Sequence, residues 1–173
     1  MKKGMLISLC LFLISLGLQA QGWSFGGNGN SYKSDCFGLD LGIGGVKYAG
    51  GAELSIGLRY LHNFNEYIGW DVIGAQGLGN TSDFGGSFVI QGMTGIRSYS
   101  PTFYKDMRGY VNFRVGYGYA TDIEEGGFCY ELGTGINLTR TLYAGYGYNC
   151  QNFTMGGWKF KQHYHAFRFG FNF

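Results

Sequence analysis

Two histidines near the end of the chain are the residues whose type and spacing most suggest chemistry. His163 and His165 are two positions apart, which in an extended strand puts both rings on one face. They could supply two metal ligands, but zinc sites take three or four, and His62 falls at the opposite end of the predicted structure. Neither a Ser nor an Asp or Glu that would support nucleophilic catalysis lies near the pair. The sequence therefore predicts no metal site, no cofactor and no enzymatic activity.

A second set of reactive groups consists of charged residues at the polar positions of alternating polar and apolar segments. Four are acids and four are arginines, whereas all five lysines after residue 20 fall in predicted loops or at strand ends. A solvent-facing sheet is usually rich in Lys and Glu, so balanced acids and arginines favour a narrow interior in which charges pair. The predicted interior charge network comprises Asp40, Glu53, Arg59, Asp71, Arg97, Arg114, Glu131 and Arg168.

These charges are expected to form two clusters at different levels of the interior. Glu53 and Glu131 should lie near one mouth, with Arg114 at mid-height. Arg59 and Arg97 should lie towards the other end, near Asp71.

The elements that must position these residues are eight strands of roughly ten residues each, joined by turn-type segments. In the most regular of them, residues 109–120, Val111, Phe113 and Tyr117 alternate with Asn112 and Arg114. The predicted strands are 36–46, 52–61, 67–78, 87–98, 109–120, 128–138, 142–150 and 162–173.

The last strand carries an aromatic ladder on one of its faces. Phe167, Phe169, Phe171 and Phe173 occupy every second position, so the four rings share a side. Lipid contacts such a face in a transmembrane barrel. The alternative is a soluble ligand-binding barrel, which would place its apolar face inside.

Composition restricts the class of protein further. Thirty-three Gly and 14% charged residues disfavour helices and an ordinary soluble surface. The apolar run that follows Lys2 and Lys3 is typical of a cleaved signal peptide, predicted over 1–20. Residues 21–35 are predicted as a flexible tail and 36–173 as the barrel. Without the signal the chain is neutral, which gives no reason to expect a nucleic-acid partner.

The signal peptide, the strand count and the Phe ladder together resemble the small eight-stranded outer-membrane barrels, the OmpX-like group and the transmembrane domain of OmpA. The resemblance implies an all-β, up-and-down antiparallel barrel, integral to the bacterial outer membrane, with both termini in the periplasm. It also implies that the barrel-assembly machinery reads Phe167, Phe169, Phe171 and Phe173.

The function expected from these features is a structural or envelope-organising role for a barrel with a filled interior. One alternative is the barrel subunit of a larger envelope protein complex. A second is a narrow pore for small solutes, although eight strands leave an interior only wide enough for side chains.

Lipid contacts are expected along the last strand. Lys159, Lys161, His163 and His165 share parity with the Phe ladder, so a regular strand carries all of them on its outer face. Phosphates of lipopolysaccharide in the outer leaflet would pair with these cations. The alternative is a solvated rim with no lipid role.

Two further features lead to local predictions. In the linker 98–108, Ser100 before Pro101 resembles a helix start, and Phe103 and Tyr104 could dock an envelope partner. The alternative is an ordinary loop with a single turn of helix. Cys36, Cys129 and Cys150 are odd in number. Simple alternation favours free thiols, while a bulge would permit a disulfide between Cys129 and Cys150.

Overall fold

The computed structural model describes residues 34–46, 52–80, 88–155 and 158–173 of the chain. The predicted signal peptide, 1–20, and the predicted tail as far as residue 33 lie outside the described residues. No helix in the described ranges has the length and apolar character needed to cross a membrane. The strands are β1 (Asp35–Val46), β2 (Ala52–Asn63), β3 (Ile68–Asn80), β4 (Phe88–Tyr99), β5 (Arg108–Ala120), β6 (Glu125–Asn137), β7 (Leu142–Met155) and β8 (Trp158–Asn172).

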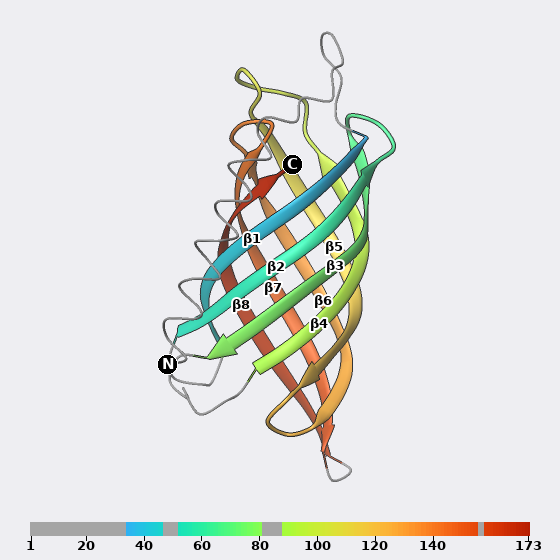
Figure 1. The fold of residues 1–173 in the computed structure, drawn as a ribbon, viewed down its shortest axis with the longest axis vertical. Helices are drawn as coiled ribbons and strands as arrows, with labels where there is room; N and C mark the ends of the chain where they lie inside the picture. Colours follow the sequence, from blue (N-terminus) through green and yellow to red (C-terminus); the bar gives the residue numbers. More distant parts are fainter. Residues whose placement is uncertain (1–33, 47–51, 81–87, 156–157) are drawn as a thin grey trace. The chain divides into compact units, whose positions relative to one another are not determined.

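The eight strands form one closed antiparallel barrel (Figure 1). Each strand pairs with the next along the chain, and β8 returns to pair with β1 from Gly38↔Asn172 to Val46↔Tyr164. Within the closed part of the barrel, every strand is therefore paired on both sides. The predicted up-and-down architecture is confirmed.

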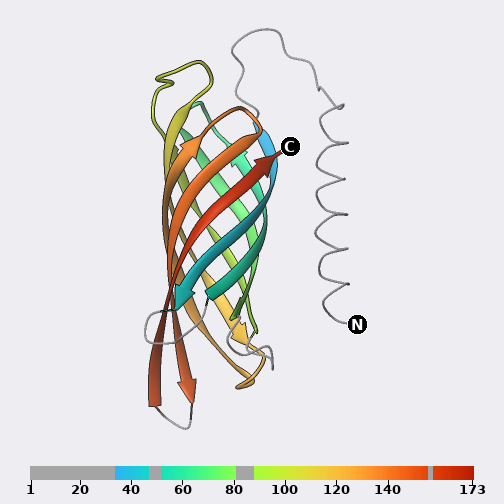
Figure 2. The same cartoon turned by 90° about the vertical axis from the view of Figure 1, so that its left-hand side faces the viewer.

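The two open ends of the barrel differ. We call the end at which β1 begins and β8 ends the terminal rim. The other end, the hairpin rim, is where β7 and β8 project beyond their neighbours (Figure 2). Their ladder continues to Met155↔Trp158, whereas β1 accompanies β8 only as far as Tyr164. The predicted strands 142–150 and 162–173 are therefore too short, because most of the segment 151–161 between them, predicted as a loop, is paired strand.

Alternation separates the residues of each strand between the interior and the outer face. In β5, Asn112 and Arg114 are buried, while Val111, Phe113 and Tyr117 are exposed. This is the distribution expected of a pleated strand with two different environments. The same inside–outside assignment holds in β2, β4 and β8.

A bulge in β3 interrupts this regularity. The register with β4 shifts between Asp71 and Gly74, so Val72 and Ile73 together take the place of one outward residue. Beyond the bulge Ile73 and Ala75 are exposed, whereas Gly74 and Gln76 are buried. Simple alternation from Ile68 would have assigned this half of the strand to the wrong faces.

The connection between β4 and β5 contains no helix, so the helix start predicted at Ser100 is wrong. The Ser100 hydroxyl oxygen accepts a hydrogen bond from the Gly109 amide at 2.8 Å, across the loop and not from the following turn. The Met107 amide donates to the Tyr104 carbonyl at 2.7 Å, with Lys105 at a φ of 47°. The segment is a loop that contains a tight turn between Tyr104 and Met107, and it lacks the single turn of helix that the loop alternative included.

The three cysteines of the barrel, Cys36, Cys129 and Cys150, are buried, and no disulfide joins Cys129 to Cys150. Cys129 pairs with Gln151 and Tyr130 with Cys150, and the β6–β7 register contains no shift. The two thiols therefore belong to opposite faces of the sheet, so the disulfide alternative is excluded.

Candidate functional site

The most organised polar site of the barrel is its interior. All eight residues of the predicted charge network are buried there, with exposed fractions between 0% for Asp71 and Glu131 and 8% for Arg168. Charges at such depth are costly unless they are paired and hydrogen-bonded. Their partners therefore decide what the interior can do.

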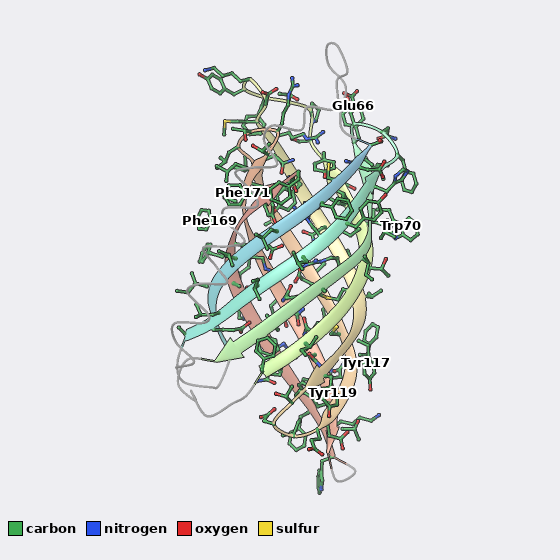
Figure 3. All side chains as sticks on the ribbon, in the orientation of Figure 1. Glu66, Trp70, Tyr117, Tyr119, Phe169 and Phe171 are labelled. Carbon is green, nitrogen blue, oxygen red and sulfur yellow. The ribbon has the colours of Figure 1, made fainter. Side chains whose placement is uncertain are left out.

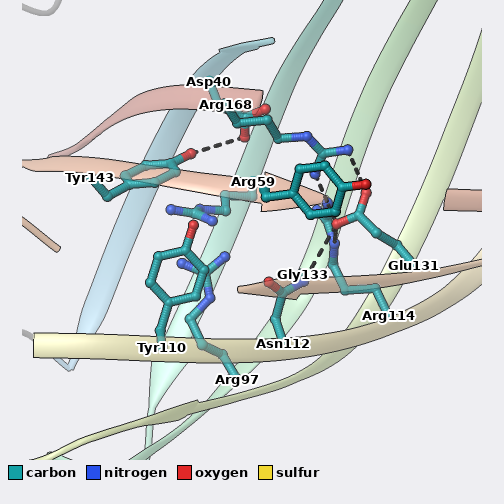
Figure 4. Close-up of a pocket in the computed structure, with 11 residues that line it drawn as sticks. Asp40, Arg59, Arg97, Tyr110, Asn112, Arg114, Glu131, Gly133, Tyr143 and Arg168 are labelled. Atoms are coloured by element: carbon teal, nitrogen blue, oxygen red, sulfur yellow. Dashed lines mark hydrogen bonds and ion pairs between the residues drawn. The ribbon is translucent and has the colours of Figure 1, made fainter. Parts of the chain in front are cut away.

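Glu131 is the centre of the network and holds two arginines (Figure 4). Arg168 forms a two-pronged pair with it, Nη1 to Oε1 at 2.8 Å and Nη2 to Oε2 at 2.6 Å. Arg114 donates to Oε1 of the same carboxylate through Nε, at 3.0 Å, and through Nη2. Asn112 adds a longer contact of 3.4 Å. One carboxylate from β6 thereby joins β5 to β8 through the interior.

A second group of charges lies nearer the terminal rim. Arg97 approaches Asp71 at 3.8 Å and stacks over the ring of Tyr110 at 4.5 Å. Arg59 donates to the Asn172 side-chain oxygen at 2.9 Å. Its guanidinium lies 4.3 Å from the ring centre of Tyr143. The arginines of this group thus rely as much on aromatic faces as on carboxylates.

The structure brings the predicted residues together differently from the expectation in two places. Glu53 does not join Arg114: it is 2% exposed, and neither of its carboxylate oxygens has a hydrogen-bond partner. The cluster that contains Arg114 is instead completed by Arg168, a residue of β8 that bonds to Glu131. Asp40, for which no partner was predicted, accepts a hydrogen bond from the Tyr143 hydroxyl at 3.0 Å.

Several interior residues that sequence reasoning did not select complete the site. Gln91 donates to Asn149 at 3.1 Å and to Gln151 at 2.6 Å. This amide layer lies between the Glu131 cluster and the hairpin rim. Beyond it lies a buried cluster of Leu78, Val89, Ala120, Phe153 and Tyr164, with the buried polar residues Ser55 and Glu53 at the same level. The sequence could have identified these amides by alternation, because Gln91, Asn149 and Gln151 all occupy inward-facing positions of their strands.

The space left between the charged side chains is small. Asp40, Arg59, Arg97, Arg114 and Glu131 help to line a cavity of about 10 Å³. That volume is roughly enough for one water molecule. A larger hollow of about 280 Å³ lies at the hairpin rim, lined by residues that include Ile123, Phe153 and Phe160.

The outer face of the barrel is its second distinctive surface. Figure 3 shows Phe169, Phe171, Trp70, Tyr117 and Tyr119 directed away from the barrel. Tyr117 and Tyr119 lie towards the hairpin rim and Trp70 towards the terminal rim. Most other exposed side chains of the outer face are aliphatic or Phe, including Leu58, Ile90, Ile96 and Phe113. An apolar band between two aromatic girdles is the surface of a barrel that lies in lipid.

Known structures share this architecture at low sequence identity. Neisserial surface protein A matches with a TM-score of 0.61 and 8% identity, over 82% of this chain and 98% of that one. The N-terminal barrel domain of OprF from Pseudomonas aeruginosa matches at 0.52 and 11%, over 80% and 97%. The outer-membrane enzyme PagL matches at 0.52 and 10%, over 77% and 97%.

The chain has the fold of the small outer-membrane barrels. The sequence itself matches no protein-family model and no curated protein sequence. The resemblance inferred from the strand pattern and the Phe ladder thus holds at the level of the fold.

The terminal rim of this outer-membrane barrel fold contains a group that the sequence did not reveal. His62 contacts Asp35 through Nδ1 at 2.8 Å, and the Tyr60 hydroxyl donates to the same carboxylate oxygen at 2.7 Å. Hydrogen bonds from His62, Tyr60 and Ser34 hold the pKa of Asp35 down at about 2. Asp35 lies four residues before Leu39, the partner of Phe171, and is thus beyond the apolar band.

Ser34, Asp35 and His62 are residue types that form catalytic triads, but their arrangement here is different. A triad requires the serine hydroxyl to bond to the histidine nitrogen that the acid leaves free. The Ser34 hydroxyl instead donates to Asp35 at 3.1 Å. The group ties the start of β1 to the end of β2, and it lacks the geometry of an activated nucleophile.

The histidines on the outer face likewise have tyrosine partners. His163 Nδ1 and the Tyr148 hydroxyl are 2.6 Å apart, and His165 Nδ1 and the Tyr146 hydroxyl are also 2.6 Å apart. Within the described ranges, no three side chains of His, Cys, Asp or Glu are grouped as a metal site would require.

Proposed function

We propose that this chain is an integral protein of the bacterial outer membrane with a closed interior and a structural, non-catalytic role in the envelope. The observation that carries the proposal is the inverted distribution of its side chains. Phe37 and Ile73 on the outer face are each 63% exposed, whereas Arg97 is 2% exposed and Asp71 and Glu131 are fully buried. Such a surface is stable in lipid and would aggregate in water.

The proposed orientation places the terminal rim in the periplasm and the hairpin rim at the cell surface. The projecting hairpin supports it: β7 and β8 extend past the end of β1 at the hairpin rim, whereas β6 and β7 are joined at the terminal rim through residues 138–141. Barrels of this kind have short periplasmic turns and longer external segments. The Phe ladder of β8 would then serve as the signal read by the barrel-assembly machinery.

The closed interior is supported by the crossing contacts of Glu131 and by the small space around them. Arg114 and Arg168 reach this carboxylate from different strands, so a solute would have to displace paired charges. Removing such a partner costs several kcal/mol. These contacts argue against the narrow pore.

Conductance across a planar lipid bilayer tests the closed interior. We expect the purified barrel to insert without producing stepwise current at neutral pH. An Arg114→Ala, Arg168→Ala double variant should leak, because it removes both side chains that cross to Glu131. Regular current steps from the unaltered protein would contradict the closed interior and favour the pore.

A subunit role in a larger envelope complex is the second candidate. It is favoured by one observation at the terminal rim, where Phe103 and Tyr104 are 59% and 60% exposed on the β4–β5 turn. Aromatic side chains held out on a tight turn are typical of interface anchors. A photo-crosslinker in place of Tyr104 should capture a specific envelope protein in intact cells if this candidate is correct, and none if the barrel acts alone.

A further inference from the structure

The outer face of β8 carries a single column that changes from cationic to aromatic. The β7–β8 ladder runs without a shift from Met155↔Trp158 to Leu142↔Phe171. Lys159, Lys161, His163 and His165 therefore lie on the same face as Phe167 and the rest of the Phe ladder. Lys159 and Lys161 are the only lysines in the eight strands.

The two histidine rings in this column are held in place by tyrosines of β7. Tyr148 bonds to Nδ1 of His163 and stacks on its ring, with centroids 5.8 Å apart and planes 22° apart. Tyr146 bonds to Nδ1 of His165 and packs against Phe167, 5.4 Å away. Because each Nδ1 is occupied, each Nε2 remains for an external ligand. With the tyrosine as donor, Nε2 carries the ring proton and can donate.

The height of the column matches the boundary of the apolar band. Ten residues separate Phe171 from Lys161, and a strand rising about 3.3 Å per residue at a tilt of about 40° climbs about 25 Å over that length. This is about the height of the lipid-facing band of an outer-membrane barrel. Lys161 thus lies at its upper edge, with Lys159 above it, His163 about 5 Å below it and His165 about 10 Å below it.

No acid among the described residues neutralises either lysine. In the described parts of the chain, no ion pair joins Lys159 or Lys161 to an acid. Lys161 pairs across the hairpin with Asn152, and Lys159 with Thr154. Two unpaired ammonium groups above two fixed imidazoles form a site complementary to phosphate.

We propose that this column, Lys159, Lys161, His163 and His165, binds the phosphate groups of an anionic outer-leaflet lipid. The ammonium groups and Nε2 atoms contact the phosphates, while Phe167 and Phe169 lie along the acyl chains. Tyr146 and Tyr148 act as positioning residues. The inference rests on the proposed membrane location and orientation, and it adds the class of ligand and the residues that recognise it.

Lipid selectivity in nanodiscs tests this proposal. The protein is inserted into phosphatidylcholine nanodiscs that contain either bisphosphorylated lipid A or the same lipid with its phosphates removed, and bound lipid is counted by native mass spectrometry. We expect the unaltered barrel to retain the phosphorylated lipid preferentially. A Lys159→Gln, Lys161→Gln variant should lose about 25-fold of that preference, since each lysine at a charged membrane surface contributes about a factor of five.

Two further variants keep the result interpretable. Lys105→Gln, Arg140→Gln removes the same number of charges at the terminal rim and should retain the preference. Tyr146→Phe, Tyr148→Phe keeps the ring packing but releases both histidines, and should weaken phosphate selectivity without affecting insertion. Millimolar inorganic phosphate should not displace the lipid; displacement would mean that the site takes free phosphate and would overturn the lipid assignment.

Insertion is recorded separately for every variant, by circular dichroism and by the gel shift between folded and heated protein. An inserted barrel with equal retention of both lipids would overturn this inference and leave the proposed function intact. Failure of the unaltered protein to insert at all would overturn the proposed function itself.

Discussion

At the scale of single residues, Glu131 has the greatest consequence for stability. It is the only carboxylate in the described interior that two arginines contact directly. Removing one arginine leaves the remaining charges buried with fewer contacts. This costs more stability than replacing the whole ion pair with apolar residues would.

Arg114→Ala should therefore reduce the free energy of unfolding by about 3–5 kcal/mol, measured by urea titration in lipid vesicles. The matched control is Arg140→Ala, which breaks the exposed contact of Arg140 with Asp106 and should cause little or no change. Equal changes in the free energy of unfolding for the two variants would contradict this prediction. They would mean that the remaining partners of Glu131 are sufficient to stabilise its buried charge.

Asp35 provides a pH-dependent test at the terminal rim. Its pKa is lowered from 3.8 to about 2 by His62, Tyr60 and Ser34, so the ionised form stabilises this corner above pH 4. That contribution is lost as the pH falls through about 2. An NMR titration of the Asn63 amide, which donates to the Ser34 carbonyl, should show a transition near pH 2. Asp35→Asn should abolish it, and a midpoint near 4 would contradict the contact.

Which residues lie inside could be predicted from alternation, but their partners could not. All eight predicted charges are buried, because parity along a strand is a local property. Pairing depends on the relative height of residues on strands that are not adjacent. Arg168 and Glu131 are 37 residues apart and come from strands separated by β7, so no local pattern relates them.

At the scale of elements, the strands approach each other closely where glycines face inward. A Cβ atom added to Gly116 would lie 2.0 Å from the carbonyl oxygen of Gly92. One added to Gly118 would meet the Gln151 side chain at 2.4 Å. The repeated Gly-Tyr pattern thus leaves room inside while it supplies tyrosines to the outer face.

Gly116→Ala should destabilise the barrel by about 1–3 kcal/mol, because the methyl group would force β4 and β5 apart. Gly92→Ala is the control on the partner strand, since a Cβ there meets nothing within 4 Å. It should leave stability unchanged or raise it by up to about 1 kcal/mol. Urea unfolding of both variants decides the comparison, and a neutral Gly116→Ala would show that the strands can separate at little cost.

The elements that sequence analysis misjudged have specific physical causes. The β3 bulge at Asp71–Gly74 changes the phase of the strand, and a bulge has no reliable sequence signature when both of its residues are apolar. The hairpin extension was read as a loop because Asn152 and Thr154 interrupt the apolar pattern. Outside the membrane, such polar residues are compatible with a paired strand.

At the scale of the whole molecule, the barrel is organised as a protein turned inside out. Its charges and amides are connected across the interior, and its aromatic and aliphatic side chains face outward. This inversion distinguishes the protein from a soluble ligand-binding barrel. The number of strands and the closure of the sheet would not distinguish them, because a soluble barrel can share both. The proposed membrane location, closed interior and lipid-binding column all depend on this inversion.

The measurement that tests this inversion most directly is the pattern of NMR contacts along β5 in lipid nanodiscs. We predict cross-peaks to acyl-chain protons from Val111, Phe113 and Tyr117, and none from Asn112 or Arg114. Strong contacts between water and the side chains of Val111, Phe113 and Tyr117, with no lipid contacts, would contradict a membrane-spanning barrel.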